Sequence, residues 1–428
     1  MALASKTGLL SSVWRDKWCV TTVTLAAEGD VVYNMRKCYT SPREAWYEMT
    51  QPVIESIETI ALQSDIDEPF GYAQAWVCNR TALLVRMEAT DGTVGWGECW
   101  GPAAGSRETI NELLAPLIQG RDPMENERIF DDMYEACRRA YQTVVPFPAL
   151  SGIDIALWDL KARLQDIPIS SLLGGRARSS VRAYATGHYF KSDASGIDEQ
   201  YERITEEARR NAKALGAVKA KIGLSFIGYG PEEDVELVHR IREAIGDDAT
   251  LMVDANYAYD TGTARQVGHA LEELDVYWFE EPVPPEHHEG YRHLRDHLDI
   301  RIAGGECHTP AEIGRLAEMG AIDVAQPDVC NVGGLTPARR VAERVQAEGV
   351  QVVPHVWGTP IAMAASLHLI STLEGRPWLE FDRSSNPLRD ELGVTDFDVS
   401  DEGHVSVPEG PGLGIRLDPN KINRYHVE

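Results

Sequence analysis

The second half of the chain alternates regularly between short apolar runs and amphipathic stretches. Eight strand-like runs begin near residues 181, 217, 250, 276, 300, 322, 350 and 377. The stretches between them have the apolar period of helices, and 231–246 starts at a proline and ends at a glycine. An open doubly wound sheet would also alternate, but no glycine-rich phosphate motif follows the first run. We therefore predict an α/β fold with a TIM-like (β/α)7β barrel over residues 179–385.

The pattern before the barrel is different and mixed. Residues 81–88 and 93–97 resemble strands joined at Asp91-Gly92, a strong hairpin signal. Three helical patterns follow, at 106–119, 123–140 and 149–165. These elements predict an α+β capping domain over residues 49–178, to which a loop-rich tail, 386–428, returns. Residues 1–48 differ from the rest in composition and in their pattern of apolar residues. We interpret them as a disordered extension or a mis-assigned start.

The amino-acid composition excludes some classes of binding partner. The 428 residues contain 67 Asp and Glu against 41 Lys and Arg, a net charge of −26, so nucleic acid and anionic lipid are excluded as expected partners. Only 9 of the basic residues are Lys and 32 are Arg, which favours a halophilic protein over an ordinary acidic one. Seven cysteines without metal spacing indicate reduced thiols in a cytoplasmic protein, and no apolar run is long enough to span a membrane.

Ionisable residues recur where the predicted strands end, which is the catalytic face of such barrels. Three acidic residues stand at the tips of consecutive strands, 26 residues apart: Asp254, Glu280 and Glu306. Their mutual repulsion would be severe without a cation between them, and oxygen ligands suit Mg²⁺. Strand alternation is expected to point Glu280 and Glu281 to opposite sides, so we assign only Glu280 as a ligand.

Two lysines and a histidine supply proton-transfer chemistry. Lys219 and Lys221 both face the barrel interior if their strand is regular, and each is expected to lower the pKa of the other. Asp328 and His355 end consecutive strands, so the carboxylate is expected to orient the imidazole and support its charged form. Glu380 ends the eighth strand.

Together these residues resemble the enolase superfamily, and within it the mandelate racemase subgroup. The resemblance runs from about Val53 to the C-terminus and rests on five features: the Lys219–Lys221 pair, the Asp254–Glu280–Glu306 triad, the His355–Asp328 dyad, Glu380, and an Asp in place of the strand-six Lys found in the muconate-lactonising subgroup. It implies one Mg²⁺ per subunit, a lid from 68–74 and 99–106, and removal of the proton α to a carboxylate to give an enediolate.

The expected substrate is a small carboxylic acid. Polar and aromatic residues beside the site suit a polyol acid, and as substrate contacts we predict His188, Asn256, His308, Trp357 and Arg383. The leading prediction is an acid-sugar dehydratase, a lyase, in which Lys221 is the base and His355 the acid, although the reverse is chemically allowed. The alternatives are a racemase, an epimerase or a cycloisomerase on the same intermediate, and a non-catalytic descendant of the fold. We expect a homo-oligomer, from dimer to octamer.

Overall fold

A computed structural model describes residues 18–25, 31–37, 51–394 and 397–428. The chain divides into two units, residues 1–52 and 53–428. In the first unit, strands β1 (Trp18–Leu25) and β2 (Val31–Lys37) pair as an antiparallel ladder. The other residues of the interpreted extension 1–48 lie outside the described part of the chain. Its disorder stays a prediction, and we also expect the protein to fold and act without it.

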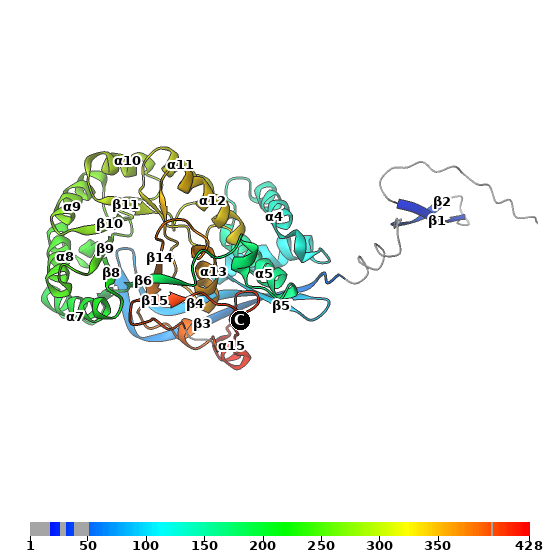
Figure 1. Ribbon diagram of the computed structural model, residues 1–428, viewed down its shortest axis with the longest axis horizontal. Helices are drawn as coiled ribbons and strands as arrows, with labels where there is room; N and C mark the ends of the chain where they lie inside the picture. The colour runs from blue at the N-terminus through cyan, green and yellow to red at the C-terminus, as the bar shows by residue number, and fades with distance from the viewer. Residues whose placement is uncertain (1–17, 26–30, 38–50, 395–396) are drawn as a thin grey trace, which may run out of the picture. The chain divides into compact units, whose positions relative to one another are not determined.

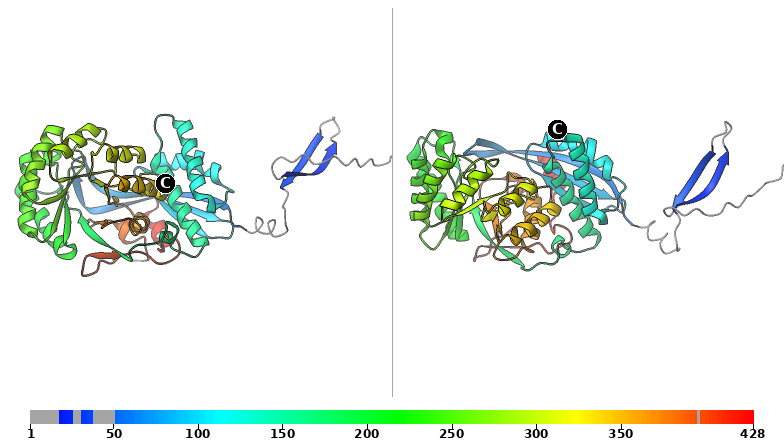
Figure 2. Two further views of the ribbon diagram at one scale, coloured as in Figure 1. Left: turned by 45° about the horizontal axis from the view of Figure 1, so that its top comes forward. Right: turned by 90° about the horizontal axis from the view of Figure 1, so that it is seen from above.

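The second unit contains the predicted barrel (Figures 1 and 2). Parallel strands run in the order β13-β12-β11-β10-β9-β8-β6-β14, so the first strand of the barrel pairs with the last. Their bounds are β6 Ser180–Thr186, β8 Ala217–Lys221, β9 Thr250–Asp254, β10 Val276–Glu280, β11 Arg301–Gly304, β12 Val324–Ala325, β13 Gln351–Val352 and β14 Trp378–Asp382. The outer helices are α7 Ile197–Leu215, α8 Pro231–Ile245, α9 Thr261–Glu273, α10 His288–His297, α11 Pro310–Glu318, α12 Leu335–Ala347 and α13 Pro360–Ile370.

One buried layer fills the interior below the strand ends. It takes a residue from or next to each strand: Tyr184, Ala217, Met252, Trp278, Ala303, Val324, Val353 and Trp378. Because side chains alternate along a strand, Lys219 points inward one step above Ala217. The layer therefore closes the floor of the barrel and leaves its carboxyl-terminal mouth for chemistry.

The capping domain is a long hairpin covered by helices. Strand β3 (Ile54–Tyr72) pairs antiparallel with β4 (Ala75–Ala89), which pairs with β5 (Val94–Cys99) across the predicted Asp91-Gly92 turn. Helices α2 (Ala103–Thr109), α4 (Asn126–Tyr141) and α5 (Phe147–Leu164) follow, with a π-helical turn at Ile110–Leu114, a short α3 (Ala115–Ile118) and a short α6 (Ile169–Leu172). A Cβ at Gly97 would lie 1.9 Å from the Gly152 carbonyl oxygen, so glycine lets β5 pack directly on α5.

Three segments tie cap and barrel together. Strand β7 (Phe190–Lys191), from the first barrel loop, joins the cap sheet beside β3. In the tail, which includes a short α14 (Pro387–Asp390), β15 (His404–Ser406) pairs with β6. Helix α15 (Pro419–Tyr425) follows, and the Val427 amide donates to the Ala61 carbonyl of β3.

The α/β class and the barrel are thus confirmed. The predicted lid segment 68–74 is the tip of the β3–β4 hairpin together with an irregular stretch, because the ladder shifts register between Asp65 and Phe70. The tip reaches the barrel, where the Gln74 side chain donates to the Asn256 carbonyl at 2.7 Å. Within the described residues, no helix is long and apolar enough to cross a membrane.

Candidate active site

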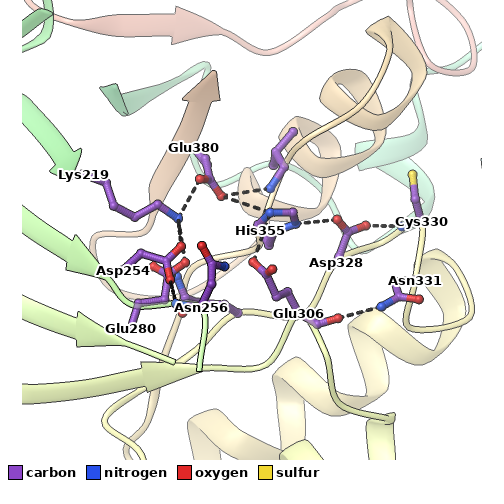
Figure 3. A network of polar contacts seen from close by, with 12 residues as sticks. Lys219, Asp254, Asn256, Glu280, Glu306, Asp328, Cys330, Asn331, His355 and Glu380 are labelled. Carbon is purple, nitrogen blue, oxygen red and sulfur yellow. Dashed lines mark hydrogen bonds and ion pairs between the residues drawn. The ribbon is translucent and has the colours of Figure 1, made fainter. Parts of the chain in front are cut away.

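The strand ends bring the predicted ionisable residues into one buried group (Figure 3). Lys219 Nζ lies 2.6 Å from Glu280 Oε1 and 2.7 Å from Glu380 Oε1, and its side chain is fully buried. Lys221 Nζ pairs with Asp254 Oδ2 and lies 3.1 Å from Asn256 Oδ1. Strands β8, β9, β10 and β14 therefore hold two ammonium groups among three carboxylates.

The histidine and its aspartate form the other side of the group. His355 Nδ1 lies 2.6 Å from Asp328 Oδ2, and Nε2 lies 3.1 Å from Glu306 Oε2. The Cys330 amide donates to Asp328 Oδ1 at 2.6 Å, which fixes the carboxylate. We name the following nine residues the mouth cluster: Lys219, Lys221, Asp254, Glu280, Glu281, Glu306, Asp328, His355 and Glu380.

The electrostatics of His355 match the prediction and those of the lysines do not. Burial alone would lower the pKa of His355, but Glu306, Glu380 and Asp328 raise it to about 10, so the imidazole carries a proton at neutral pH. Burial would also lower the pKa of both lysines, yet Glu280 raises that of Lys219 and Asp254 raises that of Lys221. Lys219 does lower the pKa of Lys221, but the closer carboxylates raise it more, so the prediction that the pair brings the pKa below the ordinary lysine value is wrong for this structure.

The assignment of Glu280 rather than Glu281 as a ligand stays a prediction. Strand β10 ends at Glu280, and Glu281 leaves it with φ +42°, so both side chains are buried. Glu280 is well partnered, with Gln326 and Trp278 donating to Oε2 at 2.6 and 3.0 Å. Among the described residues, no N–H or O–H group donates to either carboxylate oxygen of Glu281, and its polar neighbour is the Cys307 thiol. Burial and the nearby Glu306 raise the pKa of Glu281 well above its usual range.

The mouth cluster fits a divalent cation. It holds six carboxylates against the three cationic groups Lys219, Lys221 and His355, and all nine side chains are buried or nearly so. Glu306 Oε2 faces His355 Nε2 at 3.1 Å, and oxygens of Glu281 and Glu306 lie within 4.8 Å of each other and of the Cys307 thiol. Excess buried negative charge is what a hard cation would neutralise. The predicted ligands Asp254, Glu280 and Glu306 stay a prediction, with Glu281 beside them.

Two of the predicted substrate contacts lie at the mouth cluster. Asn256, at φ +40°, presents its amide to Lys221 and is buried. Trp357 lies in an aromatic wall with Trp100, with the rings tilted and their centroids 5.6 Å apart, and Trp100 in turn lies 5.4 Å from the His355 ring. The indole nitrogen of Trp357 is buried and has no partner in the described structure. Both positions are suited to contact a substrate.

The other three predicted contacts are not brought to the cluster. Both ring nitrogens of His188 are engaged, by the Lys219 carbonyl at 2.8 Å and by Asn211 at 3.1 Å, so His188 supports strand β8 from behind. His308 Nε2 contacts the Pro285 carbonyl at 3.0 Å, beneath α10. Arg383 is exposed and lines a separate pocket at the edge of the lid. A position next to a strand end in the sequence did not show whether a side chain points toward the mouth cluster or away from it.

Sequence reasoning missed residues of the cap that enclose the site. Arg80 of β4 is almost fully buried and reaches the barrel, where it pairs with Asp382 at 3.0 Å. Its guanidinium also stacks 4.3 Å from the Trp357 ring centroid and 5.0 Å from that of Phe70 in the lid. No local signal marked Arg80, because its partners are about 300 residues away in sequence.

Comparisons with known proteins agree with this geometry. Residues 56–174 match the mandelate racemase / muconate lactonizing enzyme N-terminal domain, and residues 203–421 match the enolase C-terminal domain-like family. A D-galactarolactone cycloisomerase of Agrobacterium fabrum is 39% identical over 87% of this chain and 99% of its own. An arabinonate dehydratase of Saccharolobus solfataricus is 32% identical over 80% of this chain and 90% of its own.

Solved structures have the same fold. The 3,6-anhydro-D-galactonate cycloisomerase of Zobellia galactanivorans superposes with a TM-score of 0.79 at 36% identity, covering 88% of this chain and all of its own. A racemase of Streptomyces coelicolor with bound magnesium has a TM-score of 0.78 at 26% identity, over 88% of this chain and all of its own. On these matches and on the paired lysines, carboxylates and His–Asp dyad, the chain belongs to the mandelate racemase subgroup of the enolase superfamily.

Proposed function

We propose that the protein removes the proton α to the carboxylate of a sugar acid and then expels an oxygen substituent from the neighbouring β-carbon. With a free hydroxyl as the leaving group, the reaction is a dehydration to a 2-keto-3-deoxy acid. The observation that supports it is the arrangement of Lys221 and the Asp328-bound His355 at two sides of one buried carboxylate cluster. Relatives named as acid-sugar dehydratases support the same class.

The protein's own groups divide the proton transfers. His355 is held by Asp328 through Nδ1 and is charged at neutral pH, so its Nε2 proton is available to a departing oxygen. Lys221 is the proposed base at the α-carbon. Its pKa is raised by Asp254 as the structure stands, so it must lose that stabilisation before it can accept a proton.

The predicted cofactor fits this need. Asp254, Glu280 and Glu306 would hold one Mg²⁺, and Glu281 lies next to them. The ion would supply positive charge that stabilises the enediolate. A carboxylate shared with such an ion stabilises an ammonium less, so the pKa of Lys221 would fall toward the range of a useful base. Lys219, fully buried beside Glu280 and Glu380, would remain charged and face the substrate carboxylate.

A second candidate follows from the relatives. When the expelled β-oxygen belongs to a ring, the same two proton transfers open the ring and the product is an isomer of the substrate. The cycloisomerases at 39% and 36% identity favour this reaction on a ring-closed sugar acid. The two candidates require the same residues and differ only in the leaving group.

The test is product analysis with Mg²⁺ and a panel of open-chain and ring-closed sugar acids. A 2-keto acid lighter than its substrate by one water indicates dehydration, whereas a product of unchanged mass indicates cycloisomerisation. In D₂O, His355→Asn should still exchange the α-proton without eliminating, and Lys221→Ala should do neither. The exposed Lys213→Ala and the buried His308→Asn are matched controls. Exchange that survives loss of Lys221 but not of His355 would reverse their roles, and full activity in both variants would move the site elsewhere.

A further inference from the structure

An outer pocket lies at the edge of the lid. Its volume is about 460 Å³, and it is lined by lid residues 67–70, by helix α7 and by the residues that follow β14. The rings of Phe70 and Tyr189 stack 4.3 Å apart and both line this pocket. Lys221 Nζ is 5.7 Å from the centroid of the Tyr189 ring. An aromatic pair therefore lies between the outer pocket and the mouth cluster.

The outer pocket is cationic in a strongly anionic protein. Its ionisable lining consists of four cations, Lys191, Arg203, Arg210 and Arg383, and three carboxylates, Asp67, Glu68 and Glu207. Within the described residues, the Arg383 guanidinium makes no ion pair within 4 Å and stacks 5.8 Å from the Phe381 ring centroid. Arg210 has only a loose pair, 3.8 Å from Glu206. On a chain of net charge −26, such a pocket is a local attractor for an anion.

The lid segment beside the pocket is weakly held. The β3–β4 ladder is interrupted between Asp65 and Phe70, and only the pairs Phe70–Lys191 and Gly71–Phe190 join β3 to β7. Few backbone hydrogen bonds must therefore break for residues 66–70 to move. Movement of Phe70 away from Tyr189 would separate the aromatic pair.

We propose that the outer pocket is an entry site that binds the carboxylate of the sugar acid before it passes the Phe70–Tyr189 pair, an inference that rests on the proposed function. Guanidinium groups bind carboxylates through paired hydrogen bonds, and Arg383 and Arg210 are the groups with unused donors. Asn211 and Ser385, also in the lining, offer polar groups to substrate hydroxyls. Encounter with an anion would thereby be concentrated at the edge of the lid where Tyr189 separates the outer pocket from Lys221.

The experiment compares two neighbouring arginines on the same helix. Arg210 lines the outer pocket, whereas Arg209 does not, and both are exposed, at 65% and 55%, and pair with the same Glu206. Arg210→Gln and Arg209→Gln change the net charge equally, so any general field effect is matched. Arg383→Gln is the second pocket variant. The readouts are kcat and kcat/KM on a turned-over sugar acid, and hydrogen exchange of residues 66–72 and 383–386 with galactarate or uncharged galactitol.

We expect Arg210→Gln and Arg383→Gln to lower kcat/KM about three- to tenfold with kcat nearly unchanged, an effect that shrinks at high salt, and Arg209→Gln to change neither. Galactarate, but not galactitol, should slow exchange in both segments, and the pocket variants should lose this protection. Equal effects of Arg209→Gln and Arg210→Gln would overturn the entry site while leaving the proposed function intact. If no sugar acid is turned over but galactarate protection still depends on Arg210, the proposed function fails and an anion site remains.

Discussion

Buried carboxylates occur in two regions of this protein, and their surroundings are opposite. At the seam between cap and barrel, Glu98 of β5 accepts hydrogen bonds from the Thr359 amide at 3.0 Å, its hydroxyl at 2.6 Å and the Ala362 amide at 3.1 Å. Asp154 of α5 likewise accepts from the Thr336 amide and hydroxyl, at 2.8 and 2.6 Å. These carboxylates cap helices α13 and α12.

The carboxylates of the mouth cluster also accept neutral donors, such as the Cys330 amide at Asp328 and the Gln326 side chain at Glu280, but most of them contact a cationic group as well. Lys219, Lys221 and His355 are long or titratable groups, and among the described residues no N–H or O–H group donates to Glu281. A fixed amide donor at a helix N-terminus stabilises a carboxylate permanently. A cluster with more carboxylates than cationic groups can instead bind a cation. The comparison teaches that buried acids used for structure and for chemistry differ in their donors rather than in their burial.

The largest expected effect is on catalysis. Asp254→Asn, Glu280→Gln and Glu306→Gln should each lower turnover by about a thousandfold or more while the protein stays folded, because the predicted cation site loses a ligand. Steady-state rates and Mn²⁺ binding measured by electron paramagnetic resonance check this. Full activity in thoroughly chelated, verifiably metal-free protein would contradict it.

At the seam between cap and barrel, we expect a substitution to lower stability rather than turnover. Asp154→Ala should lower the free energy of unfolding by about 2–4 kcal/mol, because the buried donors of Thr336 lose their acceptor. Urea denaturation measures this, and activity per folded molecule should be retained. Glu306→Gln is the control, with activity lost and stability nearly kept, because Asp328 still pairs with His355. If the two variants behaved alike, the distinction between the regions would not hold.

Removal of one surplus charge should stabilise the mouth cluster. In metal-free protein, Glu281→Gln is expected to raise the free energy of unfolding by about 1–2 kcal/mol, because a buried carboxylate that accepts no hydrogen bond from a described N–H or O–H group is replaced by a neutral amide of the same shape. Added Mg²⁺ should reduce the difference. A destabilised variant would show that the carboxylate is already compensated.

Glu98 predicts a pH dependence at the seam. Burial raises its pKa from 4.5 to about 7, so the folded state binds more protons between these values. The contribution of this group to stability is therefore present at low pH and is lost as pH rises through about 7. Relative to the wild type, Glu98→Gln should become more stable as pH rises from 4.5 to 7.5. If the melting temperatures of the wild type and Glu98→Gln changed with pH in parallel across that range, Glu98 would have an ordinary pKa.

Added salt should act on the surface charges of the protein rather than on the buried carboxylates of the seam or of the mouth cluster. With a net charge of −26, the melting temperature is expected to rise by a few degrees from low to multimolar KCl through screening of self-repulsion. The changes in the free energy of unfolding caused by Asp154→Ala and Glu281→Gln should not depend on salt, since buried charges are poorly screened. A flat or falling melting temperature would refute the halophilic interpretation.

The periodic part of the fold could be predicted from sequence because each β/α unit carries its own pattern. The predicted residues of the mouth cluster were found for the same reason, since a strand end fixes both the position and the face of Asp254 or Glu280. Glu281 has a positive φ, which sequence does not reveal, so strand alternation does not fix where its side chain lies. Arg80, Glu98 and Asp154 act across the seam, where no local pattern reports the partner.

The short ladder between β3 and β7 has a kinetic consequence. It consists of two residue pairs, Phe70–Lys191 and Gly71–Phe190, and one of its strands belongs to the barrel and the other to the cap. Loop and lid motions of this size occur on the microsecond-to-millisecond timescale. If substrate enters through the outer pocket, the lifetime of this ladder would set how long a captured molecule is kept from water before it is released.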